Sequence, residues 1–293
     1  MRLPDVIGVG PPRTGTTWLH RVLEGHVDLP YGVKETQFFT TFYDKGIDWY
    51  ARHFRYATGK RPIVEICPYL LNPLAPDRIK THMPDCRVIA TLRNPVDLTF
   101  SVYKMNIHYA WVRGSFDEVL KSRPDLGGWS RYATRFKKWF ETFGRENVLV
   151  TIYDELRADP QKYLDRVTGF IGVERIALSE KPQIGDDINS FRLAPRNRKL
   201  ARRGTRVMYW LKGRQAYGTI NFLDRAGIWE FCQGGGQPFP RLTPEQEDRL
   251  RARYLPEVEA LEELLAIDLS AWKKPRTPRT VEDAPRALRS GNG

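Results

Sequence analysis

The sequence predicts an α/β fold in which helices flank a doubly wound parallel sheet. Short apolar runs alternate with segments whose apolar residues recur at helical spacing, which is the pattern of parallel strands joined by helical crossovers. We expect four strands, at 6–10, 63–66, 87–92 and 147–152. Gly15, Arg93 and Tyr153 follow three of these strands, and ligands of open parallel sheets bind at that edge.

The first strand leads into a loop with the glycine spacing of a phosphate-binding loop. Gly10 and Gly15 bound it, and a helical pattern begins at Thr16. Free backbone N–H groups and the dipole of such a helix favour an anion. A nucleotide triphosphatase would place Lys after the second glycine, whereas this chain has Thr16 there and a cation, Arg13, inside the loop. The fold is therefore P-loop-like but not suited to ordinary ATP hydrolysis; a plain strand–turn–helix connection is the alternative.

The third strand predicts a second anion site. Arg93 follows this strand, and Asn94 and Asp97 have the positions of an N-cap and a box-like third residue of the next helix. Ser101 lies about two turns into that helix. A triphosphatase would place a Mg²⁺-binding Asp at the end of such a strand. Two separate cationic sites instead suggest a nucleotide that is phosphorylated at two places.

The fourth strand is framed by helices. Aromatic residues recur at helical spacing between Trp129 and Phe143, and we assign this stripe to the core. Tyr153 follows the fourth strand, and Asp159 begins another amphipathic helix. Tyr153 could contact a ligand at this edge of the sheet, and the alternative is an aromatic side chain packed in the core.

The C-terminal third is less regular. Residues 178–230 read as a partly helical insertion, and Gly234–Gly236 as a flexible loop. Thr243 is a typical N-cap of a further helix, which Pro256 should kink or end. Proline, arginine and glycine dominate from residue 273 onward, so we expect a disordered tail at 273–293.

Composition bounds the remaining possibilities. The chain has 293 residues, 41% of them hydrophobic, which fits one domain over residues 1–272. No run approaches the ~20 apolar residues of a membrane span. The first strand is expected so early in the sequence that we expect no signal peptide. The three cysteines are widely spaced and suggest neither a disulfide framework nor a metal site. We therefore expect a cytoplasmic protein without a metal.

Basic residues are concentrated in one segment. Nine Lys or Arg residues and no acidic residue fall between Arg192 and Arg214, against a net charge of +12 for the whole chain. Such a run could meet an anionic small molecule, a lipid surface or nucleic acid. A solvated face of an insertion is the plain alternative.

The two anion motifs together resemble those of sulfotransferases that use 3′-phosphoadenosine 5′-phosphosulfate. Pro12–Leu19 is similar to their 5′-phosphosulfate loop, and Leu92–Pro95, with Ser101 and Tyr103, is similar to their 3′-phosphate motif. Two further segments resemble the glycosaminoglycan (heparan-type) and related bacterial branch, namely Lys34–Phe39 and Lys45–Tyr50. The resemblance covers about residues 5–175 and resumes near 230–272.

This resemblance implies three catalytic residues. Glu35 is the implied general base for the hydroxyl of the acceptor. Arg13 is implied to hold the 5′-phosphate and the leaving oxygen, although many relatives have Lys there and Arg donates a proton poorly. Lys34 is a second candidate for neutralising the sulfonate or the bridging oxygen. In an extended segment Lys34 and Glu35 would point to opposite sides.

The resemblance also implies how the donor is held. Loop residues and the N–H groups of the first helical turn would bind the 5′-phosphate, Arg93 and Ser101 the 3′-phosphate, and Tyr153 would lie near the adenine. A glycine loop would close over the nucleotide, where relatives usually supply a basic residue. The implied set is Arg13, Thr14, Gly15, Thr16, Thr17, Trp18, Arg93, Ser101, Tyr153, Gly235, Gly236 and Gln237.

The partners follow in the same way. The product would be adenosine 3′,5′-bisphosphate, and the acceptor a hydroxyl-bearing carbohydrate or a glycosylated or small metabolite, with the 178–230 insertion on the acceptor side. The alternatives are a P-loop kinase of a small molecule and a nucleic-acid-binding module built on the basic run. His108 is a weaker candidate than Glu35 for the base. Contact with a membrane surface stays open, and no nucleic acid is expected.

Overall fold

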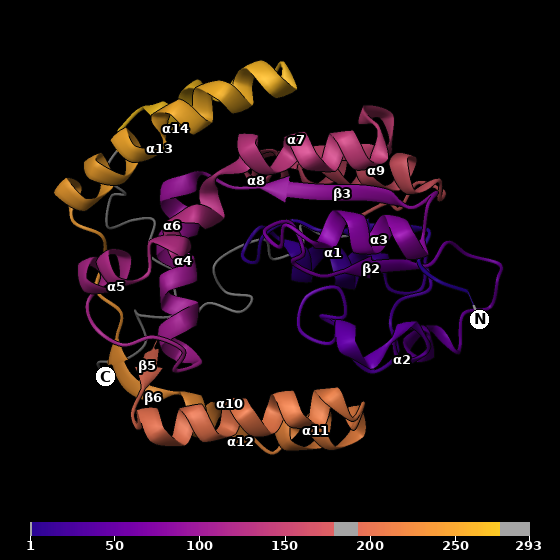
Figure 1. The fold of residues 1–293 in the computed structure, drawn as a ribbon, viewed down its shortest axis with the longest axis horizontal. Helices are drawn as coiled ribbons and strands as arrows, with labels where there is room; N and C mark the ends of the chain where they lie inside the picture. Colours follow the sequence, from indigo (N-terminus) through magenta and orange to yellow (C-terminus); the bar gives the residue numbers. More distant parts are fainter. Residues whose placement is uncertain (1, 179–192, 276–293) are drawn as a thin grey trace, which may run out of the picture.

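The computed structural model describes residues 2–178 and 193–275 and confirms the α/β class (Figure 1). Its main sheet has four parallel strands in the order β2-β1-β3-β4. The strands are β1 (Val6–Gly8), β2 (Val64–Ile66), β3 (Arg87–Leu92) and β4 (Val148–Ile152). Strand β1 is shorter than expected because the chain turns into the glycine-bounded loop after Val9, whose N–H still donates to Ile89 at 2.7 Å.

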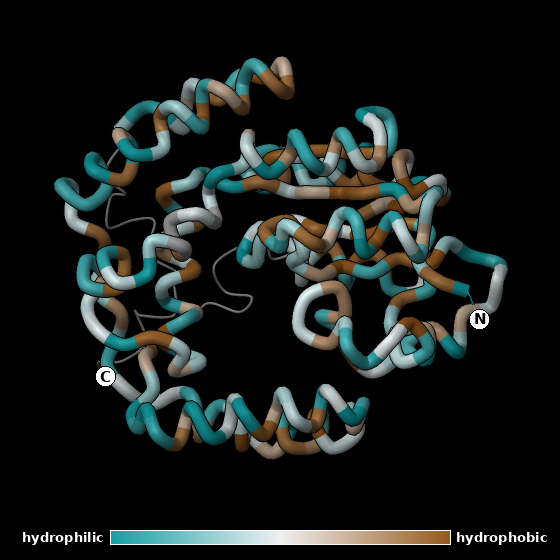
Figure 2. The backbone as a smooth tube through the Cα atoms, viewed as in Figure 1, coloured by the Kyte–Doolittle hydropathy of each residue, from teal (hydrophilic) through white to brown (hydrophobic). Residues whose placement is uncertain are grey.

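Helices cover both faces of this sheet. Val88, Ala90 and Leu92 of β3 belong to a large core that includes residues of α3 and α7, whereas Ile89 belongs to a second core with residues of α1 and α9. This alternation along one strand is the doubly wound arrangement. Figure 2 shows apolar segments gathered in the strands. The helices around the sheet are α1 (Thr16–Leu23), α3 (Ala75–His82), α7 (Tyr132–Phe143), α8 (Tyr153–Ala158) and α9 (Pro160–Ile171).

Further helices connect the layers. Asn94 caps α4 as expected, because its side chain accepts a hydrogen bond from the N–H of Val96 at 3.0 Å. The connecting α-helices are α2 (Ile47–Ala51), α4 (Pro95–His108), α5 (Phe116–Ser122) and α6 (Pro124–Gly127). The 3₁₀ helices are η1 (Tyr43–Lys45), η2 (Arg52–Phe54), η3 (Gly128–Ser130) and η4 (Arg145–Asn147).

The C-terminal third is more regular than its sequence pattern suggests. Its helices are α10 (Arg198–Gly213), α11 (Tyr217–Arg225), α12 (Ile228–Gln233), α13 (Pro244–Leu265) and α14 (Ser270–Lys273). Helices α10 to α12 lie side by side, apart from α13 and α14 (Figure 1). The described parts of the chain contain no helix long and apolar enough to cross a membrane.

One prediction for this region is wrong, and of the two outcomes expected at Pro256 the structure excludes one. Gly234–Gly236 is not a free loop, because β6 (Gly235–Pro238) pairs antiparallel with β5 (Leu193–Pro195). Helix α13 is not ended by Pro256, which is exposed, so water can solvate the carbonyl that loses its partner. Thr243 caps α13 as expected. Residues 276–293 of the expected tail, and 179–192 of the expected insertion, lie outside the described residues.

Candidate active site

The loop after β1 needs its second glycine. Gly15 is the N-cap of α1 and has a φ of 84°, in the left-handed region that favours glycine. A Cβ there would lie 2.5 Å from the side chain of Leu156. The hydroxyl of Thr14 is buried and donates to the carbonyl of Pro11 at 2.8 Å, so Thr14 holds the loop from inside.

Helix α1 points its first N–H groups at this loop. The N–H of Leu19 donates to the carbonyl of Gly15 at 3.0 Å, so the N–H groups of Thr16, Thr17 and Trp18 precede the first bond inside the helix. The side chain of Trp18, by contrast, is buried and meets Tyr163 edge to face at 5.9 Å between ring centroids. Trp18 can therefore contribute its backbone N–H, while its indole is part of the core.

The two predicted anion motifs meet at Arg13. Its Nε donates to Ser101 Oγ at 2.9 Å, and its carbonyl accepts from Arg93 Nη1 at 3.1 Å. Arg13 has a φ of 74°, a backbone conformation that non-glycine residues rarely adopt and that is found at binding sites. The guanidinium of Arg93 also lies 5.0 Å from the ring centroid of Tyr153. The site thus unites the carboxyl ends of β1, β3 and β4.

Lys34 and Glu35 face the same loop rather than opposite sides. Lys34 Nζ donates to Thr16 Oγ1 at 3.0 Å and to Glu35 Oε1 at 2.7 Å. The expectation for an extended segment is wrong because residues 34 and 35 belong to no strand and the backbone turns between them and α2. An ammonium group therefore connects the expected general base to the first residue of α1.

The charge state of Glu35 suits a proton acceptor at neutral pH. Burial raises its pKa, but the charge and the hydrogen bond of Lys34 lower it, and the charges of Lys212 and His20 lower it further. The net result is a pKa below the ordinary value for Glu. Glu35 is consequently a carboxylate that can accept a proton.

Sequence reasoning missed Glu65, which supports this segment from β2. Its carboxyl group is buried and accepts hydrogen bonds from the N–H of Thr36 at 3.1 Å and from the hydroxyls of Thr36, Tyr50 and Tyr69. Burial raises the pKa of Glu65 against the effect of these bonds. A charged residue inside the apolar run 63–66 was the available signal, since such a residue must find buried partners.

A cluster of aromatic residues near Glu35, formed by Tyr109, Trp111 and Tyr209, was also missed. The ring centroids of Tyr109 and Trp111 are 5.0 Å apart, and those of Trp111 and Tyr209 are 6.2 Å apart. The charge of Glu35 raises the pKa of both tyrosines in addition to burial, the main cause. Residues 109 and 111 follow α4 and Tyr209 belongs to α10, so only the fold brings them together.

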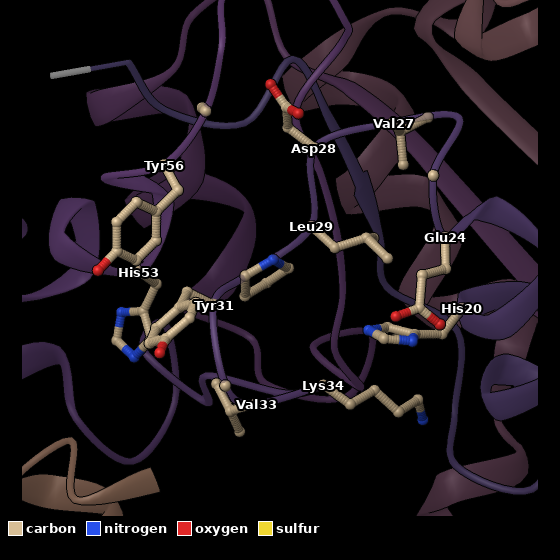
Figure 3. A pocket seen from close by; sticks show the side chains of 14 residues that line it. His20, Glu24, Val27, Asp28, Leu29, Tyr31, Val33, Lys34, His53 and Tyr56 are labelled. Atoms are coloured by element: carbon tan, nitrogen blue, oxygen red, sulfur yellow. The ribbon is translucent and has the colours of Figure 1, made fainter. Parts of the chain in front are cut away.

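A pocket of about 500 Å³ opens beside Lys34 (Figure 3). His20 and Glu24 of the α1 region lie at its Lys34 end, and Tyr31 and Tyr56 at the other. The two tyrosine rings are half-exposed or more, and the guanidinium of Arg55 lies 4.6 and 4.9 Å from their centroids. Burial, and then the charge of Lys34, lowers the pKa of His20, so this imidazole is neutral at neutral pH.

The Gly235–Gln237 segment has a basic neighbour that the sequence did not reveal. Arg196, just after β5, donates its Nε to the carbonyl of Gly235 at 3.2 Å. Pairing of β5 with β6 brings this arginine beside Gly235, in the segment where the sequence offered Gln237 and no basic residue. His108, the weaker candidate for the base, is held by Gln233 and by the backbone of Leu193, and burial lowers its pKa.

No group of three or more His, Cys, Asp or Glu side chains in residues 2–178 and 193–275 is placed to hold a metal ion. The end of β3, where a triphosphatase would present an Asp, presents Arg93.

Comparison with known proteins agrees with this geometry. The family model "Sulfotransferase domain" matches residues 3–183. A bifunctional heparan sulfate N-deacetylase/N-sulfotransferase 1 from Mus musculus is 31% identical over 59% of this chain, which spans only 22% of that relative. A heparan sulfate glucosamine 3-O-sulfotransferase 6 from Mus musculus is 26% identical over 87% of this chain and 70% of its own length. A sulfotransferase crystal structure from Alicyclobacillus acidocaldarius shares the fold, with a TM-score of 0.67 and 23% identity over 94% of this chain and all of its own.

Proposed function

This chain belongs to the sulfotransferase domain family, and from that premise we propose that it transfers a sulfuryl group from 3′-phosphoadenosine 5′-phosphosulfate to a hydroxyl of a carbohydrate or glycosylated metabolite. The observation that carries the proposal is the ammonium of Lys34, which hydrogen-bonds both Thr16 in the anion loop and the carboxylate of Glu35. An anion cradle and a proton acceptor are thereby joined in one site.

The residues present fit a donor with two phosphate positions. The N–H groups of Thr16–Trp18 and the guanidinium of Arg13 would hold the 5′-phosphate, and Arg93 with Ser101 the 3′-phosphate. Arg196, which hydrogen-bonds the carbonyl of Gly235, would close over the latter. A kinase is not favoured, because Thr16 takes the position of the P-loop lysine and Arg93 that of the metal-binding Asp.

The side chains divide the chemistry between them. The donor supplies a sulfuryl group on a phosphate oxygen, and transfer forms a new bond from the acceptor oxygen to sulfur while the bond from sulfur to that phosphate oxygen breaks. Glu35 takes the proton of the acceptor hydroxyl. Lys34 stabilises the charge that develops on the sulfonate and the leaving oxygen. Arg13, bonded to Ser101, holds phosphate rather than donating a proton.

A sugar-like acceptor is favoured by the surroundings of Glu35. Tyr109, Trp111 and Tyr209 form an aromatic cluster near Glu35, and the pocket beside Lys34 offers about 500 Å³. A pocket of this size accommodates a small ligand such as one or two sugar rings. The O-sulfotransferase relative aligns over most of both chains, which supports a hydroxyl rather than an amine as acceptor.

The direct test is a transfer assay. Purified protein is incubated with donor carrying labelled sulfate and with a panel of glycans, glycosides and aryl alcohols, and both labelled product and released adenosine 3′,5′-bisphosphate are measured. We expect stoichiometric release and labelling with a glycan or glycoside. Labelling of amino sugars alone would reassign the acceptor group, and no transfer from the donor to any acceptor would contradict the proposal.

We further propose a reducing compartment, the cytoplasm, as the setting. Cys67, Cys86 and Cys232 are free thiols, and the first two are buried. Alkylation of the denatured protein, taken directly from cells, should label all three thiols. Recovery of a disulfide-linked form would argue for an oxidising compartment instead.

A further inference from the structure

Large apolar side chains reach solvent in one part of the molecule above all. Half of the twelve exposed large hydrophobic residues in the described parts of the chain lie between residues 193 and 231. They belong to β5 and to the three-helix layer α10–α12, and are Leu193, Val207, Trp210, Phe222, Ile228 and Phe231. Phe222 and Phe231 are 69% and 72% exposed, which is unusual for phenylalanine.

The apolar residues of α10 are turned away from the active site. Val207 and Trp210 recur with Arg203 and Arg214 at steps of three and four, so these four residues share one side of the helix. The opposite side is fixed to the rest of the molecule, where Thr205 donates to the carbonyl of residue 109 at 3.2 Å. We call the exposed residues of α10, α11 and α12 the outer surface.

Helix α12 repeats this division. Gln233 is buried and donates to Thr205 Oγ1 at 3.2 Å, and Trp229 is buried with its Nε1 donating to the carbonyl of Ile220 at 3.2 Å. Ile228 and Phe231 lie on the other side of the helix and are exposed. The inner sides of α10 and α12 are thus joined by a buried hydrogen bond, whereas their outer sides expose aromatic and aliphatic side chains to water.

The charge of the outer surface is strongly positive. Helix α10 contains no acidic residue, and the exposed acids of the layer are Asp224 and Glu230. The guanidinium of Arg214 lies 3.7 Å from the ring centroid of Trp210, which couples the cationic and aromatic groups. The exposed cations of α10 and the residue after it that can contribute to this charge are Lys199, Arg202, Arg203, Arg206 and Arg214, whereas Arg198 donates to the carbonyl of residue 110 on the inner side.

We propose that the outer surface docks on an anionic lipid bilayer. Helices that lie in a membrane interface, without crossing the bilayer, expose Trp and Phe beside many Arg and Lys residues. The outer surface has this composition, and none of its helices is long and apolar enough to cross a membrane. Anionic headgroups attract the cations, and the aromatic rings insert at the level of the headgroups. Nucleic acid would use the charge but leave the apolar side chains in water. The inference is independent of the proposed function, because none of the outer-surface residues is part of the active site.

Vesicle sedimentation tests the proposal with the full chain. We expect binding to vesicles of phosphatidylcholine mixed with phosphatidylglycerol, and about tenfold weaker binding to phosphatidylcholine alone. The apolar variant carries W210S, F222S and F231S, and it should lower the partition coefficient on the anionic vesicles by about tenfold or more. The charge variant carries R202Q, R203Q and R206Q. It should lower the partition coefficient by a similar factor and remove most of its salt dependence.

Matched controls lie outside the layer. Three exposed hydrophobic residues replaced by Ser, and three exposed cations replaced by Gln, should leave the partition coefficient unchanged. All variants should keep the circular dichroism and melting temperature of the wild type, since every site is exposed. The control substitutions are L74S, L255S and I267S, and separately K121Q, K137Q and R253Q.

Three results would overturn the proposal. The first is no binding to anionic vesicles. The second is binding that the charge variant abolishes but the apolar variant leaves intact, together with equal binding to a single-stranded oligonucleotide, which would make the surface a polyanion site. The third is a concentration-dependent dimer that the apolar variant dissociates, which would make it a self-association surface.

Discussion

At the scale of single residues, we propose different tasks for the two cations of the site. Arg13 donates a hydrogen bond to Ser101 and its carbonyl accepts one from Arg93, so we assign Arg13 to phosphate binding. Lys34 donates hydrogen bonds to Thr16 and to Glu35, so we assign Lys34 to the transfer step. From sequence alone either cation could assist the leaving group. Their hydrogen-bond partners favour Lys34.

Glu35→Gln should lower kcat by about 10²–10⁴-fold, because Gln cannot accept the proton of the acceptor. Affinity for adenosine 3′,5′-bisphosphate should stay close to that of the wild type, since the base acts on the acceptor. Glu141→Gln, an exposed carboxyl group of α7 outside the pocket, is the matched control and should retain activity. Near-normal kcat in Glu35→Gln would move the base elsewhere, first to the neutral imidazole of His20.

The pH profile offers a separate check on Lys34. Glu35 must be deprotonated to act, and its lowered pKa means that activity is lost only as the pH falls below the ordinary Glu range. Lys34→Met removes the charge and the hydrogen bond that lower this pKa, and leaves burial, which raises it. The acid limb of kcat/KM should therefore shift to higher pH in Lys34→Met. An unshifted limb would show that another group titrates there.

Arg93→Ala and Ser101→Ala should each weaken discrimination at the 3′ position. The measurement is the ratio of dissociation constants for AMP and for adenosine 3′,5′-bisphosphate, in which AMP serves as the internal control. Loss of one charge-assisted or hydroxyl contact to the 3′-phosphate costs about 1–3 kcal/mol, or about tenfold to a hundredfold in that ratio. An unchanged ratio in both variants would place the 3′-phosphate at another cation, for which Arg196 is the next choice.

At the scale of elements, the sequence predicted what is repeated locally and missed what depends on distant partners. Strand β3 and the caps of α4 and α13 follow from apolar runs and capping residues. Pairing of Gly235–Pro238 with Leu193–Pro195 depends on a segment some forty positions away, so glycine content alone suggested a loop. The bends that bring Lys34 to Thr16, and Tyr209 to Trp111, likewise have no local signature.

Glu65 shows how an element positions the site. It lies in β2 and holds Thr36, the residue after Glu35, through two hydrogen bonds. Glu65→Gln replaces one acceptor oxygen by a donor among groups that all donate, so it should lower the free energy of unfolding by about 1–3 kcal/mol. Because the pKa of Glu65 is raised in the folded state, part of the wild-type stability should be lost as the pH rises through that pKa, and this loss should be absent in Glu65→Gln.

Measuring kcat distinguishes a positioning role of Glu65 from a purely structural one. In Glu65→Gln, measured well below its melting temperature, kcat should fall while the affinity for adenosine 3′,5′-bisphosphate is retained, because the loop and Arg93 do not contact Glu65. Tyr69→Phe removes one donor to the same carboxyl group and should have a smaller effect in the same direction. Unchanged kcat at reduced stability would limit Glu65 to a structural role.

At the scale of the whole molecule, nucleotide binding should stabilise the fold without a metal. The loop after β1, Arg93 after β3 and Ser101 on α4 come from separate parts of the chain and meet at Arg13, so a ligand bound to all of them would oppose unfolding of the sheet as a unit. At about a hundred times its dissociation constant, adenosine 3′,5′-bisphosphate should add about 2.7 kcal/mol to the free energy of unfolding. The measurement is the melting temperature with chelator present.

The same experiment with ATP separates the two nucleotide chemistries. ATP lacks the 3′-phosphate that Arg93 and Ser101 would hold, so its stabilisation should be smaller, and Mg²⁺ should not increase it, since Arg93 stands where a kinase needs a carboxylate. Arg93→Ala should bring the effect of the bisphosphate down toward that of AMP, because it removes the contact that tells them apart. Strong, Mg²⁺-dependent stabilisation by ATP with none by the bisphosphate would mean that the Gly10–Thr17 loop, despite its family, works as a triphosphate cradle.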